Sequence, residues 1–415
     1  MLSIPKLLSR RWARRVAIAA LGLLLAIAWF APAPAQLAEP GAPPGQAAAT
    51  RQSQREFRGA WLTNIDSGVL FSSVQTASGI QRLAQLGLNT LYPTVWNWGY
   101  TLYPSTVAES AIGSAVDPHP GLSDRDLLEE LTRLGHDAGM SVIPWFEFGL
   151  MTPSYSELAR RHPDWLTQRQ DGSRTFMQGR HPRVWLNPLH PEVRTFLVDL
   201  ITEVVSRYPI DGIQFDDHFS WPVAFGYDAY TVAQYRQAHA GRNPPDDPQD
   251  ADWMAWRAEQ LTSLMEEITA AVRHVRPDAI ISLSPNPQPF AYEQYLQAWD
   301  RWQQRGWIDQ LVVQIYRPTV DAFAEELDRL MAMGAQTHSS VGVGILAGLK
   351  NRPLAPDLIA DQVAAVRDQG LDGFSFFFFE SMRNAAFQPL FSSAPASKLP
   401  GSLQNNAAKC WGHPV

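Results

Sequence analysis

The sequence has almost no cysteine, since Cys410, close to the C-terminus, is the only one in 415 residues. An internal disulfide is therefore excluded, and the fold has to be stabilised by its hydrophobic core. Beyond residue 15 the chain also lacks any block of lysine and arginine, and its formal net charge is −7. Phosphate binding needs clustered basic residues, so nucleic acid is not expected as a partner, and neutral or mildly charged substrates fit better.

The first 35 residues have the pattern of a secretory signal. A basic stretch, SRRWARR, precedes the apolar run AIAALGLLLAIAWF and the small-residue ending APAPA. The apolar run is shorter than the roughly 20 residues that span a bilayer. We therefore expect cleavage and export to the periplasm, the cell envelope or the medium, without stable membrane insertion; an uncleaved anchor is the alternative. Residues 36–55 are predicted to be a flexible linker and residues 393–415 a C-terminal tail.

Between these ends, amphipathic stretches alternate with eight near-continuous apolar runs, a pattern typical of parallel strands covered on both faces. The runs are FRGAWLTN (57–64), LNTLYPTVW (88–96), SVIPWFEFG (141–149), IDGIQFDDHF (210–219), AIISLSPN (279–286), DQLVVQIY (309–316), VGVGIL (341–346) and DGFSFFFFE (372–380). Helices are expected at 124–139 and 355–370, each ending on a glycine. The pattern predicts an α/β fold, a (β/α)8 TIM barrel over residues 56–392 with enlarged loops at the C-terminal face of the strands. A doubly wound open sheet is the alternative, although no glycine-rich phosphate loop follows the first run.

The stretch DGIQFDDHF ends a predicted core strand on two carboxylates. Ile213 and Phe215 suit the apolar helix layer, which directs Gln214 and Asp216 into the lumen. Asp216 then lies at the mouth, where catalytic groups of such barrels sit. The same alternation directs into the lumen Trp145 with Glu147, Ser282 with Ser284, and Gln314 with Tyr316.

Carboxylates around such a mouth suggest glycoside hydrolysis, which requires two of them. Neighbours on a strand point to opposite sides, so Asp217 is expected to hydrogen-bond a loop or a substrate hydroxyl while another strand supplies the partner of Asp216. The candidates are Glu147, Glu380 and Asp309. Glu147 comes first because its alternation faces the lumen, whereas the run FFFFE does not alternate and leaves Glu380 without an assigned direction.

Aromatic side chains are frequent at the predicted strand ends, and their faces suit sugar rings. Trp96, Trp98 and Trp221, in predicted loops, are candidates for sugar subsites, together with Trp145. The long loops 97–124 and 150–186 are expected to determine specificity.

The chain from about residue 55 to 390 resembles the glycosyl-hydrolase-like family 10 group of bacterial proteins. The matching motifs are, in order, REFRGAWLTNIDS, RHPDWL, WLNPLHPEVR, YPIDGIQFDDHF, SLSPN and WIDQLVVQIYRP. The resemblance implies a (β/α)8 barrel, export, and action on bacterial cell-wall or related glycan strands. It also implies a cleft lined by Asp216, Asp217, Asn187, Gln314 and Tyr316. Asn64 and His218, within the same motifs, complete the predicted substrate contacts.

The sequence departs from two related patterns. Many members carry WFNP where this chain has Trp145, Phe146, Glu147 and Phe148, so the resemblance does not assign a role to Glu147. Well-studied retaining barrels place their carboxylates on strands four and seven, but the seventh run here is VGVGIL, without an acid. The stereochemical outcome therefore stays open, as do the sugar, the linkage and the oligomeric state.

Two rival functions are retained. Asp216, Asp217 and His218 could ligate a metal for hydrolysis such as sugar deacetylation. Three contiguous ligands from one strand end argue against that reading, as does the scatter of the other histidines, so neither a metal nor a cofactor is expected. The second rival is a barrel that binds glycan without catalysis.

Overall fold

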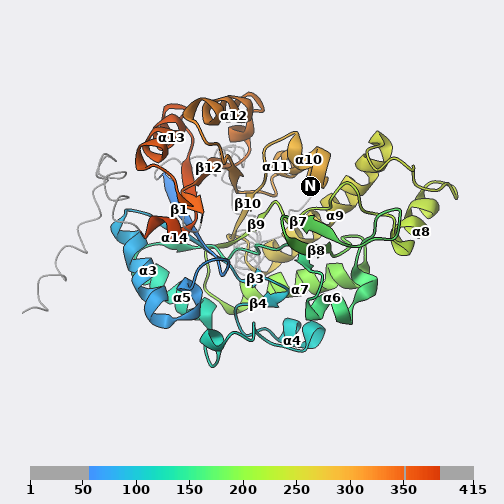
Figure 1. The fold of residues 1–415 in the computed structure, drawn as a ribbon, viewed down its shortest axis with the longest axis horizontal. Coiled ribbons are helices and arrows are strands. Elements are labelled where there is room, and N and C mark those ends of the chain that lie inside the picture. The colour runs from blue at the N-terminus through green and yellow to red at the C-terminus, as the bar shows by residue number, and fades with distance from the viewer. Residues whose placement is uncertain (1–55, 350–351, 384–415) are drawn as a thin grey trace, which may run out of the picture. The chain divides into compact units, whose positions relative to one another are not determined.

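In a computed structural model, which describes residues 56–349 and 352–383, eight parallel strands form one sheet with helices outside it (Figure 1). All eight apolar runs contribute a strand, so the predicted barrel is confirmed. The strands are β1 (Phe57–Leu62), β2 (Thr90–Pro93), β5 (Ser141–Val142), β9 (Gly212–Asp216), β10 (Ile280–Ser284), β11 (Gln310–Gln314), β12 (Ser340–Leu346) and β15 (Gly373–Phe377). The predicted signal, linker and tail lie outside the described residues.

The sheet closes on itself just after β5. Its strand order is β5-β2-β1-β15-β12-β11-β10-β9, and Trp145 forms parallel bridges to Thr94 on one side and Gln214 on the other. The main-chain N–H of Phe146 donates to the carbonyl of Gln214 at 2.8 Å. This closure excludes the open doubly wound alternative.

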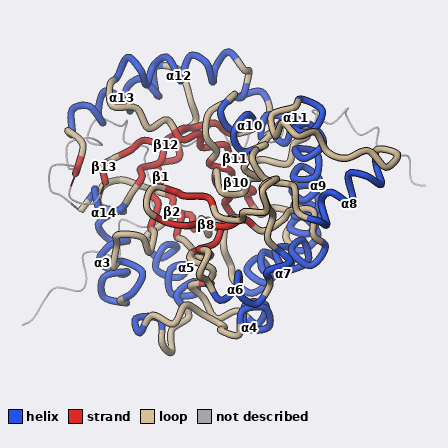
Figure 2. The backbone as a smooth tube through the Cα atoms, turned by 45° about the vertical axis from the view of Figure 1, so that its right-hand side comes forward, coloured by secondary structure: helices blue, strands red, loops and turns tan. Residues whose placement is uncertain are grey.

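Helices surround the strands, as the tube drawing in Figure 2 shows. The helices are α3 (Ser73–Gln85), α4 (Thr106–Ile112), α5 (Leu127–Asp137), α6 (Glu157–Arg161), α7 (Pro191–Arg207), α8 (Ala229–Ala238), α9 (Ala251–Val275), α10 (Phe290–Tyr295), α11 (Trp299–Gln304), α12 (Val320–Ala332), α13 (Pro356–Asp368) and α14 (Phe379–Met382). Both helices expected from the sequence are present. Asp126 caps the start of α5, whereas Pro356 begins α13, and each helix is followed by a glycine of positive φ. No helix within the described ranges is long and apolar enough to cross a membrane.

Short antiparallel strands lie in the enlarged loops. The first hairpin joins β3 (Trp96–Asn97) to β4 (Tyr100–Thr101). A three-stranded sheet after β5 has the order β6-β8-β7, with β6 (Met151–Pro153), β7 (Phe176–Gln178) and β8 (His181–Trp185). β13 (Gly348–Leu349) and β14 (Arg352–Pro353) pair after β12. The three-stranded sheet falls within the predicted loop 150–186, and the first hairpin starts one residue before the predicted loop 97–124.

The barrel has two apolar layers that follow the predicted alternation. Ile213 and Phe215 pack in the large cluster beneath the helices, as predicted. A smaller cluster inside the barrel contains Phe57, Trp61, Tyr92, Ile143, Trp145 and Val312. Hydrogen bonds between polar side chains cross the lumen of the barrel. Trp61 Nε1 donates to Gln214 Oε1 at 2.7 Å, and Gln214 Nε2 donates to Ser282 Oγ at 2.9 Å. Gln214 therefore faces the lumen, which places Asp216, two residues on, at its upper end.

At the opposite end of the barrel, four strand pairs are joined by the same two hydrogen bonds, which we call strand clasps. In each, the residue before or at the start of one strand donates its N–H to the carbonyl of a residue on the preceding barrel strand and accepts that residue's N–H through its side-chain oxygen. The clasps are Asn89 on Arg58, Asp211 on Val142, Asp309 on Ile281 and Asp372 on Val341. Buried backbone groups need partners, and the clasps supply them where the ladders begin.

Candidate active site

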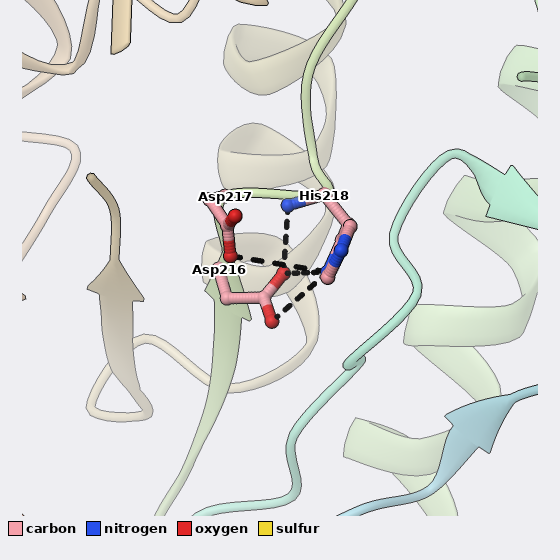
Figure 3. A group of neighbouring side chains, drawn as sticks. All are labelled: Asp216, Asp217 and His218. Atoms are coloured by element: carbon pink, nitrogen blue, oxygen red, sulfur yellow. Dashed lines mark hydrogen bonds and ion pairs between the residues drawn. The ribbon is translucent and has the colours of Figure 1, made fainter. Parts of the chain in front are cut away.

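Asp216, Asp217 and His218 lie together where β9 ends (Figure 3). Asp216 is 2 % exposed, and its Oδ1 accepts the main-chain N–H of His218 at 2.9 Å. Burial raises the pKa of Asp216 to about 6; the His218 imidazole opposes this rise and the Asp217 carboxylate adds to it. A carboxyl group with such a pKa can exist in either protonation state near neutral pH.

Glu147 supplies a second buried carboxylate from the segment that follows β5. Its Oε2 accepts hydrogen bonds from Thr63 Oγ1 at 2.8 Å, Thr94 Oγ1 at 2.7 Å and Asn97 Nδ2 at 2.7 Å. Burial nevertheless raises the pKa of Glu147 to about 7, since it outweighs the two threonine hydroxyls, and the Asp216 charge raises it further. The other oxygen, Oε1, accepts no hydrogen bond from the described residues, so a proton on it would have no competing partner.

His218 connects the two carboxylates. Its Nδ1 lies 3.0 Å from the carbonyl oxygen of Glu147 and 3.4 Å from Asp216 Oδ2. Burial alone would lower the pKa of this imidazole, but Asp217, Asp216 and Glu147 together raise it to about 10. An imidazole with this pKa is protonated near neutral pH, and its Nε2 lies 3.0 Å from the side-chain amide of Gln178.

The chain reverses tightly beside His218. Gly149 has φ +48°, and a Cβ at this position would lie 2.6 Å from the Phe219 nitrogen and 2.7 Å from the His218 carbonyl carbon. Leu150 N–H donates to the His218 carbonyl at 3.1 Å. Glycine in the stretch EFG therefore allows the segment carrying Glu147 to approach the turn after β9.

Asp217 points toward the neighbouring strands β10 and β11. Its Oδ1 accepts from Gln314 Nε2 at 3.0 Å, and its Oδ2 accepts from Asn286 Nδ2 at 3.1 Å. Tyr316 lies close enough for the charges of Asp217, Asp216 and Glu147 to add to the burial that raises its pKa well above the usual range. The structure thus brings Asp217, Gln314 and Tyr316 together with the two buried carboxylates.

The two other candidates for the second carboxylate have different partners. Glu380, in α14, accepts from Ser67 Oγ at 2.7 Å and forms an ion pair with Arg383 at 3.0 Å. Asp309 belongs to a strand clasp at the opposite end of the barrel and also pairs with Arg273. The prediction for Asp309 is therefore wrong, because the sequence order placed it at the start of a strand, away from the mouth.

Several predicted substrate contacts are fully buried. Trp96 donates to the Gly149 carbonyl at 3.0 Å, and Trp221 donates to Thr167 Oγ1 at 3.2 Å. Both indole side chains are 0 % exposed. Asn187 is equally buried and donates to Asp228 Oδ1 and Thr231 Oγ1 at the start of α8. These three side chains therefore have no surface for a sugar, which corrects their prediction as contacts. Trp145 is 4 % exposed inside the barrel, and its indole N–H has no acceptor among the residues that the structure describes.

Trp98 and Asn64 lie nearer to the carboxylates. Trp98 occupies the β3–β4 turn with φ +55°, partly exposed, and its N–H donates to Asn97 Oδ1 at 2.6 Å. Asn64 Oδ1 accepts from Asn97 Nδ2 at 2.7 Å. Asn97 thus ties the Trp98 turn and Asn64 to Glu147. A bulky residue at positive φ is uncommon and is often found at functional sites.

Sequence reasoning missed the residues that hold the carboxylates: Thr63, Thr94, Asn97, Gln178, Asn286 and Gln297. Gln297 Nε2 donates to the carbonyls of Asp216 and Phe219, at 2.8 and 2.9 Å. The two threonines follow strands with lumen alternation, and Asn286 closes the SLSPN motif directly after β10, so three of the six had a signal. The other three are brought in by loops whose path is not encoded in a local pattern.

The same group of Asp216, Asp217 and His218 could hold a metal ion, since one ligand atom from each lies within 4.8 Å of the others. The fit is poor, because both Asp217 oxygens already accept amide N–H groups. In addition, His218 Nδ1 faces the Glu147 carbonyl, which requires a proton on the nitrogen that would have to bind the ion. These bonds satisfy the group without a cation.

The model of the family described as glycosyl hydrolase-like 10 matches residues 56–364. Glycosyl hydrolase DigH of Escherichia coli strain K12 is 28 % identical over 350 residues, which cover 74 % of this chain and 75 % of DigH. Glycosyl hydrolase YngK of Bacillus subtilis is 25 % identical over 256 residues, 57 % of this chain and 46 % of YngK. Among solved structures, the glycoside hydrolase domain of PgaB (BpsB) from Bordetella bronchiseptica aligns with a TM-score of 0.59 and 14 % identity, covering 82 % of this chain and 99 % of that domain. At this identity the structural likeness concerns the fold.

Proposed function

Because the chain belongs to the glycosyl hydrolase-like 10 family, we propose that it is an exported glycoside hydrolase that uses Asp216 and Glu147 to cleave O-glycosidic bonds. The substrate we propose is a polysaccharide of the cell envelope, namely peptidoglycan glycan strands or a related glycan. The single observation that carries the mechanism is the pair of buried carboxyl groups at one barrel mouth, with pKa values raised to about 6 and about 7.

The two environments assign the two roles. Glu147 has the higher pKa and an oxygen free of hydrogen bonds, so it is the general acid that protonates the leaving oxygen. Asp216 has the lower pKa and lies beside the imidazole of His218, which favours its ionised form. The Asp216 carboxylate therefore acts on the anomeric carbon, either directly as a nucleophile or through a water molecule.

Neighbouring groups would orient the sugar and the carboxylates. Gln314 and Asn286 hold Asp217 in position to accept substrate hydroxyls, and Tyr316 presents its phenol beside the same three acids. Thr63, Thr94 and Asn97 fix Glu147 through one oxygen and leave the other for the leaving group. Export is supported by the N-terminal signal pattern alone.

The direct experiment measures products released from purified glycan strands, intact and stripped of peptides, with and without a chelator. We expect Asp216→Asn to lower the rate by roughly a thousand-fold or more, because a positioned carboxylate contributes about that much. Asp309→Asn is the matched control, since it alters a carboxylate at the other end of the barrel and keeps the clasp oxygen. Near-parental release by Asp216→Asn would exclude the proposed role.

Two other outcomes would favour the rivals. Binding of glycan by the parent protein and by Asp216→Asn, without release by either, would indicate a noncatalytic glycan-binding barrel. Release that the chelator abolishes would indicate a metal-dependent hydrolase built on Asp216, Asp217 and His218, despite their existing hydrogen bonds.

A further inference from the structure

Arg183 is a buried cation that forms no ion pair with any of the described residues. It lies on β8 and is 3 % exposed, with no carboxylate among the described residues within ion-pair distance. Among the described residues, its guanidinium makes one hydrogen bond, from Nε to Gln178 Oε1 at 3.3 Å, and its buried Nη1 has no acceptor. Burial lowers the pKa of Arg183, although Tyr155 and the carboxylate of Glu147 oppose this fall, so keeping the charge there is costly. An unpaired buried charge is expensive, so the site is incomplete as it stands.

A second buried arginine, Arg257, shows what a structural role requires. Arg257 is 0 % exposed, and it donates to the carbonyls of Val223, Phe225 and Pro248. The Arg257 guanidinium therefore needs no further partner, because nearly every one of its N–H groups donates to an acceptor inside the protein. Arg183 has one acceptor, Gln178 Oε1, although it is only 3 % exposed.

The surroundings of Arg183 leave its guanidinium plane held but unsatisfied. The carbon Cζ lies 4.4 Å from the Trp98 ring centroid and 4.9 Å from that of Phe148. Aromatic faces fix the plane and contribute no acceptor in it. The Gln178 amide that contacts Nε also contacts His218 at 3.0 Å, so one side chain, Gln178, separates Arg183 from the imidazole beside Asp216. Neither Nη1 nor Nη2 has an acceptor among the described residues, and a guanidinium with two unsatisfied nitrogens matches a carboxylate, which accepts two parallel N–H bonds.

We propose that Arg183 binds the carboxylate of an acidic sugar residue next to the bond that is cut, with Trp98 against the sugar ring. The inference rests on the proposed glycosidase function and deepens it, because it assigns the substrate class and the residue that reads it. A glycan whose carboxylates have been converted to neutral amides would lack the acceptor that completes the pair. The β7–β8 insertion would then act as the part of the protein that selects acidic glycans.

Binding to catalytically inactive protein tests the subsite separately from hydrolysis. The probes are peptide-free peptidoglycan strands, whose muramic acid carboxylates are free, and the same strands with those carboxylates converted to primary amides. We expect the Asp216→Asn protein to bind the acidic strands roughly 10- to 100-fold more tightly than the amidated strands, because the amidated strands cannot form the charge-assisted pair with Arg183. Adding Arg183→Met should abolish this preference and leave binding at the level of the amidated strands.

Gln178→Ala in the same background distinguishes binding from positioning. If Arg183 acted only through Gln178 and His218, both substitutions would weaken the two probes equally, and the proposal would be overturned. Retention of the preference by Gln178→Ala together with its loss in Arg183→Met supports it. Arg183→Lys keeps the positive charge and is the control for misfolding. It should retain part of the preference for acidic strands and have a melting temperature close to that of the parent protein.

The failures of the two proposals differ. If the parent protein releases no product but its preference for acidic strands depends on Arg183, the proposed subsite is supported and the proposed hydrolysis is excluded. If product is released while acidic and amidated strands bind alike, or neither strand binds, the subsite is overturned.

Discussion

The Nδ1 atom of His218 lies 3.0 Å from the main-chain carbonyl oxygen of Glu147, so the turn after β9 is bonded to the backbone of the residue that carries the other carboxylate. The bond fixes the position of the end of β9 relative to the segment that carries Glu147. Because it uses the backbone of Glu147, the carboxylate of Glu147 stays available for chemistry. The spacing of the two acids is thus fixed by the imidazole and does not depend on a contact between them.

The first prediction concerns the pH dependence of the rate. Asp216 must be ionised, which occurs as pH rises through about 6, and Glu147 must be protonated, a state that is lost as pH rises through about 7. We expect kcat/KM to peak between these values and to fall on both sides. A pH–rate profile measured on glycan strands checks this. A rate that stays level from pH 7 to 9 would contradict the role of Glu147 as the acid.

Asn97 gives a second prediction, about the position of the alkaline limb. Its amide donates to the ionised form of Glu147 and so favours that form. Removal of the amide in Asn97→Ala should raise the pKa of Glu147 and move the alkaline limb upward by up to about one pH unit. Asn64→Ala leaves that bond in place and serves as control in the same measurement. A downward shift would exclude this role.

The pair Trp98 and Trp96 separates a surface role from a core role. Trp98→Ala should raise KM for glycan roughly ten-fold with little loss of stability, because its ring is partly exposed above Phe148. Trp96→Phe should cost about 1–3 kcal/mol of unfolding free energy, since the Gly149 carbonyl loses its donor. Chemical denaturation and steady-state kinetics on both variants check this. Equal effects on KM would refute the distinction.

Asp309 provides a prediction for the strand clasps. Asp309→Ala removes the acceptor of the Ile281 N–H and should lower the unfolding free energy by about 1–3 kcal/mol. The pH–rate profile should not change, because the clasp lies at the far end of the barrel from the carboxylates. Urea denaturation measures the first effect, and kinetics the second. A displaced pH optimum in Asp309→Ala would mean that the two ends of the barrel are coupled.

The barrel could be predicted from the sequence because each strand is an apolar run bounded by polar turns, and the alternation within β9 assigned Gln214 and Asp216 to the lumen. Glu147 could be ranked above Glu380 for the same reason. The exposure of the tryptophans could not, since a tryptophan in a loop sequence is buried or exposed according to how the loop folds back. Trp96 and Trp221 are covered by segments distant in the chain, and Arg183 is recognisable only once its neighbours are known.

The strand clasps divide the barrel into four two-strand modules, β1–β2, β5–β9, β10–β11 and β12–β15, each sealed at its base. A circular permutant opened between modules, in the exposed loop at residues 240–243 between α8 and α9, keeps every module intact in the chain. One opened at residues 305–306, between β10 and β11, separates the halves of a module. We expect the first permutant to refold faster, as stopped-flow fluorescence would show. The barrel would then consist of four two-strand modules that fold as units, and the order in which the chain connects them would not determine whether each module forms.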